Sequence, residues 1–227
     1  MSAKTTGLSF FSGSPILKFH MNKALKNGGV KEWLGTGSIN FFGLPFAGKD
    51  SQAHRLQAVT GGQVLGGGDI LRNSVIPKHV QDIMNDGELI PTEEYVRIVL
   101  PYLKSEAFTN KPLLLSSVGR WLGEEQSVID ALNEASHPLK AVIHLSLDEN
   151  TVRNRFLLEE KITKRGTRAD DDAAVLEKRI VEFKEKTMPV IEFYRQHNLL
   201  IEVDATLPKN AVTEEILHHL EQKALRS

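Results

Sequence analysis

The feature that most constrains the fold is a short apolar run followed by a glycine-rich turn and a helix. Residues 39–42 predict a buried strand and residues 48–59 predict a helix. The turn between them reads GLPFAGK and ends at Lys49, with Ser51 two places later. This order is typical of a loop that binds phosphate, with the hydroxyl one residue later than in the common form. Backbone N–H groups, the helix start and the lysine would face phosphate oxygens, and the hydroxyl would approach magnesium. The alternative is a turn that binds nothing.

The rest of the chain repeats this alternation of strand and helix. Further short apolar runs predict strands at residues 63–65, 113–115, 141–145 and 199–203. Helical patterns occupy residues 69–105 (broken at Gly87 and Pro91), 124–135, 148–162, 173–197 (kinked at Pro189) and 209 to the end. Alternation of this kind favours a parallel sheet covered on both faces. We therefore predict an α/β fold, a three-layer sandwich like that of P-loop nucleoside triphosphate hydrolases, with a five-stranded parallel sheet and helices on both faces.

Composition excludes several classes of protein. The chain has 227 residues, enough for one well-buried core, and a net charge of −1, which gives no overall attraction to nucleic acid or acidic membranes. No segment approaches the roughly 20 apolar residues that a membrane helix needs. The chain contains no cysteine, which excludes disulfides and thiolate metal sites. We find no secretory signal and expect a cytoplasmic protein.

Several charged residues stand where a parallel sheet would bring them together. Asp69 follows three glycines, where we expect it to cap a helix, and Arg72 lies one turn further on. Arg120 comes just beyond the strand at residues 113–115, and open α/β sheets bind ligands at that edge. Residues 163–172 form a polar loop of basic and then acidic residues, able to close over a phosphate-rich ligand. For each group alone, a solvated surface is the competing interpretation.

In this order, the motifs resemble those of the adenylate kinase family of nucleoside monophosphate kinases over about residues 38–226. GLPFAGKDSQ is similar to the glycine-rich loop of that family, and GGGDILR to its Gly-Asp-Leu-Leu-Arg segment. LLLSSVGR stands in the place of Leu-Leu-Asp-Gly-Phe-Pro-Arg, and KRGTRADD resembles the lid of the short-lid members. The resemblance implies an N-terminal extension at residues 1–37 and a kinase domain at 38–226. Within that domain it implies an acceptor-binding insert at about 66–97 and a lid at about 162–173.

The resemblance also implies roles for individual residues. Phosphoryl transfer is implied for the cationic residues Lys49, Arg120, Arg165, Arg168 and Arg179. ATP binding is implied for Pro45, Phe46, Ala47, Gly48, Lys49, Asp50, Ser51 and Arg155, with Arg155 packing on the donor adenine. Acceptor binding is implied for Gly67, Asp69, Arg72, Leu89, Arg120 and Gln126, with Gln126 reading the base. No residue is implied as a direct metal ligand, because Mg²⁺ would be held mainly through ATP phosphates and water, and the short lid implies no zinc.

Three positions depart from the family pattern. Phe46 replaces a glycine, at a cost of about 1–2 kcal/mol if the position requires φ > 0. Asp50 replaces the glycine after the lysine, and at about 8 Å it would repel each phosphate charge by roughly 2 kcal/mol. Ser116 replaces the aspartate that organises the magnesium waters. We therefore expect Asp50 either to turn away or to help hold magnesium, compensating for Ser116.

The resemblance implies reversible phosphoryl transfer from Mg-ATP to a nucleoside monophosphate. Gln126 favours AMP as the acceptor. Relatives that prefer AMP usually carry threonine before Gly-Asp and pyrimidine-preferring ones a small residue such as alanine, whereas this chain has Gly67. A UMP/CMP kinase, a nucleotide-binding protein with little catalytic activity and a different small-molecule kinase remain alternatives. The expected partners are ATP and the acceptor nucleotide, with no nucleic acid, no membrane and a monomeric chain.

Overall fold

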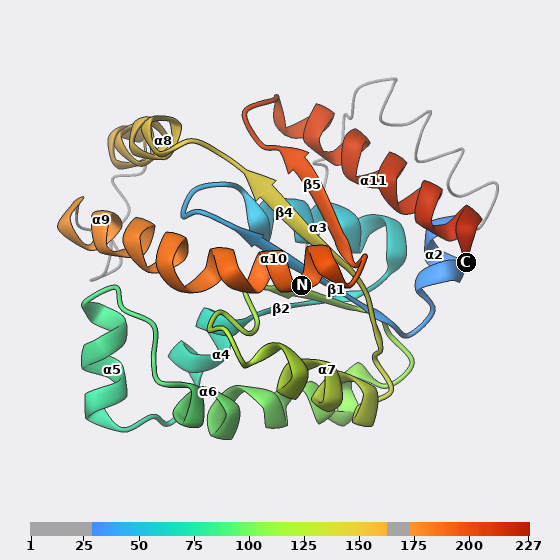
Figure 1. The fold of residues 1–227 in the computed structure, drawn as a ribbon, viewed down its shortest axis with the longest axis horizontal. Coiled ribbons are helices and arrows are strands. Elements are labelled where there is room, and N and C mark those ends of the chain that lie inside the picture. Colours follow the sequence, from blue (N-terminus) through green and yellow to red (C-terminus); the bar gives the residue numbers. More distant parts are fainter. Residues whose placement is uncertain (1–28, 163–172) are drawn as a thin grey trace, which may run out of the picture.

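The computed structural model describes residues 29–162 and 173–227, and its strands form one five-stranded sheet (Figure 1). The strand order is β2-β3-β1-β4-β5, and every pairing is parallel. The strands are β1 (Ser38–Gly43), β2 (Gln63–Gly66), β3 (Leu113–Ser116), β4 (Leu139–Ser146) and β5 (Leu200–Asp204). The predicted parallel sheet is confirmed, with strand ends that differ by one or two residues. Because the strands are parallel, their carboxyl ends meet at one edge.

Helices cover both faces of this sheet, which confirms the predicted three layers (Figure 1). Their bounds are α2 (Gly29–Leu34), α3 (Lys49–Thr60), α4 (Gly67–Asn73), α5 (Lys78–Asn85), α6 (Thr92–Val99), α7 (Glu125–Glu134), α8 (Glu149–Ile162), α9 (Ala173–Glu182), α10 (Met188–Gln196) and α11 (Lys209–Arg226). Two 3₁₀ turns, η1 (Leu100–Lys104) and η2 (Glu106–Phe108), follow α6, and a π turn, η3 (Phe183–Thr187), joins α9 to α10. In Figure 1, α5, α8 and α9 gather at the end of the molecule opposite the C-terminus.

The alternating side chains of the strands build separate cores on the two faces. Ile39 and Phe41 of β1 pack with α2, α3 and α11. Phe42 of the same strand packs with α8, α9 and α10 on the other face. A third core joins β3 to α4, α5, α6 and α7. This division follows from the two-residue period of a strand, which sends neighbouring side chains to opposite faces.

The described end of the predicted extension contributes to the first of these cores. Val30 and Leu34 of α2 are fully buried there, and the Trp33 indole donates to the Ser227 hydroxyl at 3.1 Å. The domain boundary at residue 37 stays a prediction, but residues 29–34 pack as part of the sandwich.

Two local expectations have different outcomes. Asp69 does not cap α4, because the helix starts two residues earlier, after Gly66, and its N-cap makes no side-chain hydrogen bond. Asp69 instead pairs with Arg72 within the helix. The interruption expected at Pro189 is present: α10 begins at Met188 and the π turn η3 precedes it. A proline inside a helix lacks the N–H and clashes with the carbonyl four residues back, and a π turn accommodates both effects.

Candidate active site

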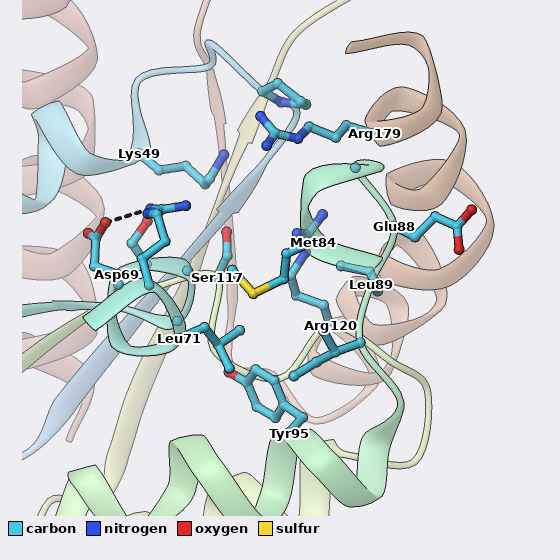
Figure 2. Close-up of a pocket in the computed structure, with 18 of the residues that line it drawn as sticks. Lys49, Asp69, Leu71, Met84, Glu88, Leu89, Tyr95, Ser117, Arg120 and Arg179 are labelled. Carbon is cyan, nitrogen blue, oxygen red and sulfur yellow. Dashed lines mark hydrogen bonds and ion pairs between the residues drawn. The ribbon is translucent and has the colours of Figure 1, made fainter. Parts of the chain in front are cut away.

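A cavity of about 210 Å³ lies at the carboxyl edge of the sheet, between the loop after β1, helix α4, the loop between α5 and α6, and α9 (Figure 2). It brings together residues that are far apart in the sequence. The predicted site residues that line it are Pro45, Lys49, Asp50, Gly67, Asp69, Arg72, Leu89, Arg120 and Arg179. Figure 2 shows Lys49 and Arg179 pointing toward the same part of the cavity from opposite sides.

Lys49 begins α3, and its ammonium group lies over the loop that precedes the helix. Its Nζ donates to the carbonyl oxygens of Gly43 at 2.9 Å and Leu44 at 3.0 Å. Burial, and after it the nearby positive charge of Arg120, lowers the pKa of Lys49 to about 8, while Asp50 opposes the shift. The lysine is therefore held inside the loop with its positive charge only partly compensated.

Phe46 does occupy a left-handed position in this loop, with φ 61°. An L-residue there costs roughly 1–2 kcal/mol, which explains why glycine suits the position. Its ring packs edge-on against Phe156 of α8, with centroids 5.6 Å apart, and such pairs contribute about 0.5–1.5 kcal/mol. Arg155 donates to the Phe46 carbonyl at 3.1 Å and to the Ala205 carbonyl at 2.5 Å. These contacts hold the strained loop in place.

Asp50 is exposed to solvent and contacts Ser116, the last residue of β3. The Ser116 hydroxyl donates to Asp50 Oδ1 at 2.6 Å, and Ser116 is only 5% exposed. Both residues line the cavity. The contact keeps the Asp50 carboxylate at the edge of the cavity, and whether it turns away from bound phosphate or helps hold magnesium stays a prediction.

The segment that starts α4 is shaped by close backbone contacts. A Cβ at Gly67 would lie 2.8 Å from the carbonyl oxygen of Ser117 and 3.1 Å from Tyr95 Oη, so the position has no room for a side chain. The Arg72 guanidinium pairs with Asp69 at 2.5 Å, the interaction dashed in Figure 2. Both side chains are more than a third exposed, so this pair is weak and Arg72 is available to an anion.

Arg120 stands on a loop whose backbone is fixed from three directions. Asn40 of β1 donates to the Val118 carbonyl at 2.6 Å and accepts from the Val118 amide at 3.3 Å. The Gly119 amide donates to Tyr95 Oη at 2.9 Å. These bonds fix the turn that leads into Arg120.

The third anchor is Glu124, which is 1% exposed. Its Oε2 accepts from the backbone amides of Arg120 at 2.8 Å and Trp121 at 3.1 Å. Burial raises the pKa of the Glu124 carboxyl, and these two hydrogen bonds oppose that shift. Burial also lowers the pKa of Arg120 to about 10, and the neighbouring Arg179 acts in the same direction. Arg120 is thus a partly buried cation on a loop whose backbone is held in place.

A second network ties the loop between α5 and α6 to α9 and η3. Glu182 Oε2 accepts from the Leu89 amide at 3.0 Å and from Lys186 Nζ at 2.5 Å. The Lys186 ammonium lies 4.2 Å above the Trp121 ring, and the Trp121 indole donates to the Ile90 carbonyl at 2.9 Å. The wall of the cavity formed by Leu89, Ile90 and Trp121 is therefore fixed by polar contacts.

Other predicted residues lie away from the cavity or outside the described residues. Gln126 is exposed and donates to Asp130 at 2.7 Å, whereas Glu124, two positions earlier, lines the cavity. Arg155 supports the loop as described above, and its packing on adenine stays a prediction. Phe46, Ala47, Gly48 and Ser51 belong to the loop and the first turn of α3 without lining the cavity. Arg165 and Arg168 lie outside the described residues.

Sequence reasoning missed the residues that position this site. These residues belong to no recognisable motif, and their side chains bond to the backbone of the loops: they are Asn40, Tyr95, Trp121, Glu124 and Glu182. Asn40 carried one usable signal, because it is a polar residue inside an otherwise apolar strand. The other four lie in segments whose sequence is ordinary for a surface helix or loop.

Chemically, the cavity is suited to a ligand with several negative charges. Lys49, Arg120 and Arg179 line it together, and burial and mutual repulsion lower the pKa values of Lys49 and Arg120. A ligand carrying phosphates would relieve this repulsion and form charge-assisted hydrogen bonds. In the described part of the chain, no helix is long and apolar enough to cross a membrane.

Comparison with known proteins agrees with this geometry. The sequence model of the family described as "Adenylate kinase" matches residues 41–199. The chain is 34% identical to an adenylate kinase of Synechococcus sp. (strain CC9902) over 181 residues, which are 78% of this chain and 94% of the relative. It is 36% identical to an adenylate kinase of Prochlorococcus marinus (strain MIT 9313) over 73% of this chain and 88% of the relative. An adenylate kinase of Agrobacterium fabrum (strain C58 / ATCC 33970) is 32% identical over 80% of this chain and 96% of the relative. The chain therefore belongs to the adenylate kinase family.

Proposed function

We propose that this protein transfers the terminal phosphoryl group of ATP reversibly to AMP, so that ATP and AMP give two ADP. The observation that carries the proposal is the convergence of Lys49, Arg120 and Arg179 in one cavity. Phosphoryl transfer needs mainly positioning and neutralisation of charge, which these side chains offer. The names of the relatives support AMP as the acceptor.

In the proposed reaction, an oxygen of the AMP phosphate attacks the γ-phosphorus of ATP. The bond between that phosphorus and the oxygen bridging to the β-phosphate breaks, and the electron pair stays on the β-phosphate of the departing ADP. Lys49 exchanges the carbonyl oxygens of Gly43 and Leu44 for phosphate oxygens. Arg179, with Arg165 and Arg168 as predicted lid residues, neutralises the charge on the transferring group. No general base is needed, because the attacking phosphate is already ionised.

The acceptor side is proposed to be held by Arg72 and Arg120. Arg72 leaves its exposed pair with Asp69, at little cost, to bind the acceptor phosphate. Arg120 needs no large change, because its backbone is already fixed by Glu124 and by the loop contacts around Gly119. The base would lie against the wall that carries Leu89 and Trp121.

Mg²⁺ is the proposed metal, entering with ATP. The donor chemistry fits: a carboxylate and a hydroxyl, Asp50 and Ser51, stand at the start of α3, and Mg²⁺ prefers oxygen ligands and keeps several waters. The described residues contain no group of three or more His, Asp or Glu side chains placed to hold a metal ion. We propose that the metal is held mainly through phosphate oxygens and water, with Asp50 receiving hydrogen bonds from that water. The bound ion would neutralise charge on the β- and γ-phosphates. A monomeric, cytoplasmic protein without zinc remains part of the proposal.

The test is coupled turnover with Mg-ATP against AMP, CMP, UMP and GMP in parallel, with Arg120→Ala as the control. Turnover with AMP that is lost in the variant is the expected result. Preference for UMP or CMP would support the proposed phosphoryl transfer but overturn AMP as the acceptor. Binding of ATP with no turnover on any of the four would favour the alternative of a nucleotide-binding protein, and the departures at Phe46, Asp50 and Ser116 would then be its natural cause.

A further inference from the structure

The carboxylates that line the cavity differ in how their charges are compensated. Asp69 pairs with Arg72, and Glu88 lies 3.8 Å from Lys178. Glu124 accepts two backbone amides. Among the described residues, Asp50 is the lining carboxylate that has neither a cation within 4 Å nor an amide partner, since its one hydrogen bond comes from Ser116.

This carboxylate is also held beside the proposed ATP site. It directly follows Lys49 in the first turn of α3, and the Ser116 hydroxyl fixes Oδ1 at 2.6 Å on the carboxyl edge of the sheet. Ser116 is buried at the end of β3, so its hydroxyl does not have the freedom of a surface side chain. ATP phosphates bound by Lys49 would therefore lie beside the negative charge of Asp50. At the roughly 8 Å expected between them, these like charges still repel each other.

We propose that Asp50, oriented by Ser116, makes the donor site select metal-complexed ATP over metal-free ATP. The inference rests on the proposed function in that it takes the Lys49 loop as the ATP site. Without a divalent cation, Asp50 repels the phosphates and weakens binding. With the cation present, the same carboxylate accepts hydrogen bonds from the cation's water and strengthens binding. Asp50 is thus a positioning and selectivity residue, and its effect changes sign with the metal.

The experiment is calorimetric titration of the full chain with ATP, once in excess Mg²⁺ and once in EDTA, with no acceptor present. The quantity compared is the ratio of the two dissociation constants, EDTA over Mg²⁺. For Asp50→Asn, which keeps the shape and an acceptor for the Ser116 hydroxyl, we expect metal-free ATP to bind more tightly and the ratio to fall about tenfold. Because the ratio compares one protein with itself, a partly unfolded fraction does not change it.

Two further variants make the test specific. The double variant Asp50→Ser with Ser116→Asp exchanges the two partners of this hydrogen bond and keeps one carboxylate at the site. Its ratio of dissociation constants should return most of the way to that of the wild type. Glu88→Gln removes a lining carboxylate that is paired with Lys178 and stands on the loop between α5 and α6, and it should leave the ratio within about twofold of wild type.

The outcomes separate this inference from the proposed function. A wild-type protein that binds ATP, with a ratio that Asp50→Asn leaves unchanged, would overturn the inference and leave the kinase intact. Weaker binding of metal-free ATP by Asp50→Asn would also overturn it, because the sign would be wrong. A wild-type protein that binds ATP under neither condition would overturn both.

Discussion

Lys49 offers a prediction in which the sign and the size both follow from the structure. Its pKa is lowered from 10.5 to about 8, first by burial and then by Arg120. Bound phosphate supplies the negative charge that the site lacks, so ATP should return the pKa toward its ordinary value. Binding of ATP above neutral pH must then be accompanied by uptake of a proton.

The expected uptake depends on pH in a defined way. With a pKa of about 8 in the free protein, roughly half of the lysines are unprotonated at pH 8 and about nine in ten at pH 9. ATP binding should therefore take up roughly 0.5 proton at pH 8 and close to one at pH 9, and little at pH 6.5. The ATP phosphates contribute little above pH 8, because the second pKa of a phosphate group is near 6.

The measurement is ATP titration by calorimetry in two buffers of different ionisation enthalpy at each pH. The slope of the observed heat against that enthalpy gives the number of protons. Lys49→Arg is the control, because arginine stays protonated throughout this range and should show no uptake. Absence of uptake by the wild type at pH 9, or equal uptake by Lys49→Arg, would refute the assignment of the proton to Lys49.

The same shift predicts how the stability of the ligand-free protein changes with pH. Between pH 8 and 10.5 the unfolded chain keeps the Lys49 proton that the folded chain has lost, so the free energy of unfolding rises with pH across this window. The gain is at most about 3 kcal/mol, from 1.36 kcal/mol per pKa unit. Urea unfolding of wild type and Lys49→Met at pH 7.5 and 10 should show the gain in the wild type alone.

Three shorter predictions test other parts of the site. Phe46→Gly should be more stable to urea than Phe46→Ala by about 1 kcal/mol, the reverse of the usual order, because both lose the Phe156 contact and only glycine relieves φ 61°. Glu182→Gln should raise the KM for the acceptor several-fold with little change in the KM for ATP, because Glu182 holds the Leu89 amide; an equal rise in both would contradict this role. Gln126→Ala should change kcat/KM for AMP less than about twofold, since the side chain is exposed and bonded to Asp130, and a larger loss would support base reading by Gln126.

The sequence predicted the sheet and the phosphate loop well because both have strong local signals. Apolar runs of three to five residues separated by helices leave few alternatives to a parallel sheet, and the glycine-spaced turn fixes where its functional edge lies. The failure at Asp69 has a local cause: an acidic residue after three glycines resembles a cap, but glycine flexibility let the helix start earlier. When a helix begins with several glycines, the sequence does not indicate which of them is the first helical residue.

The positioning residues escaped prediction for a different reason. Glu124 and Glu182 act through backbone amides of loops that become neighbours only when the sheet forms. The resemblance assigns the base-reading role to Gln126, and that role stays a prediction. The structure instead has α7 begin at Glu125 and turns Gln126 to its exposed side. Glu124 and Gln126 are two residues apart, roughly half a helical turn, so the place where α7 starts decides which of them faces the cavity. Single-sequence patterns rarely fix a helix start that closely.

The departures from the family pattern change meaning once their contacts are known. Taken singly, Phe46, Asp50 and Ser116 each weaken a nucleotide site: one strains the loop, one adds a repulsive charge and one removes a carboxylate. In the fold, Ser116 donates to Asp50, so a carboxylate is still present at the end of β3, supplied by α3. Phe46 in turn gains a ring contact with Phe156 and a hydrogen bond from Arg155, which offset its strain. Because both compensations bridge elements far apart in sequence, substitutions in a phosphate loop should be judged together with the residues they contact.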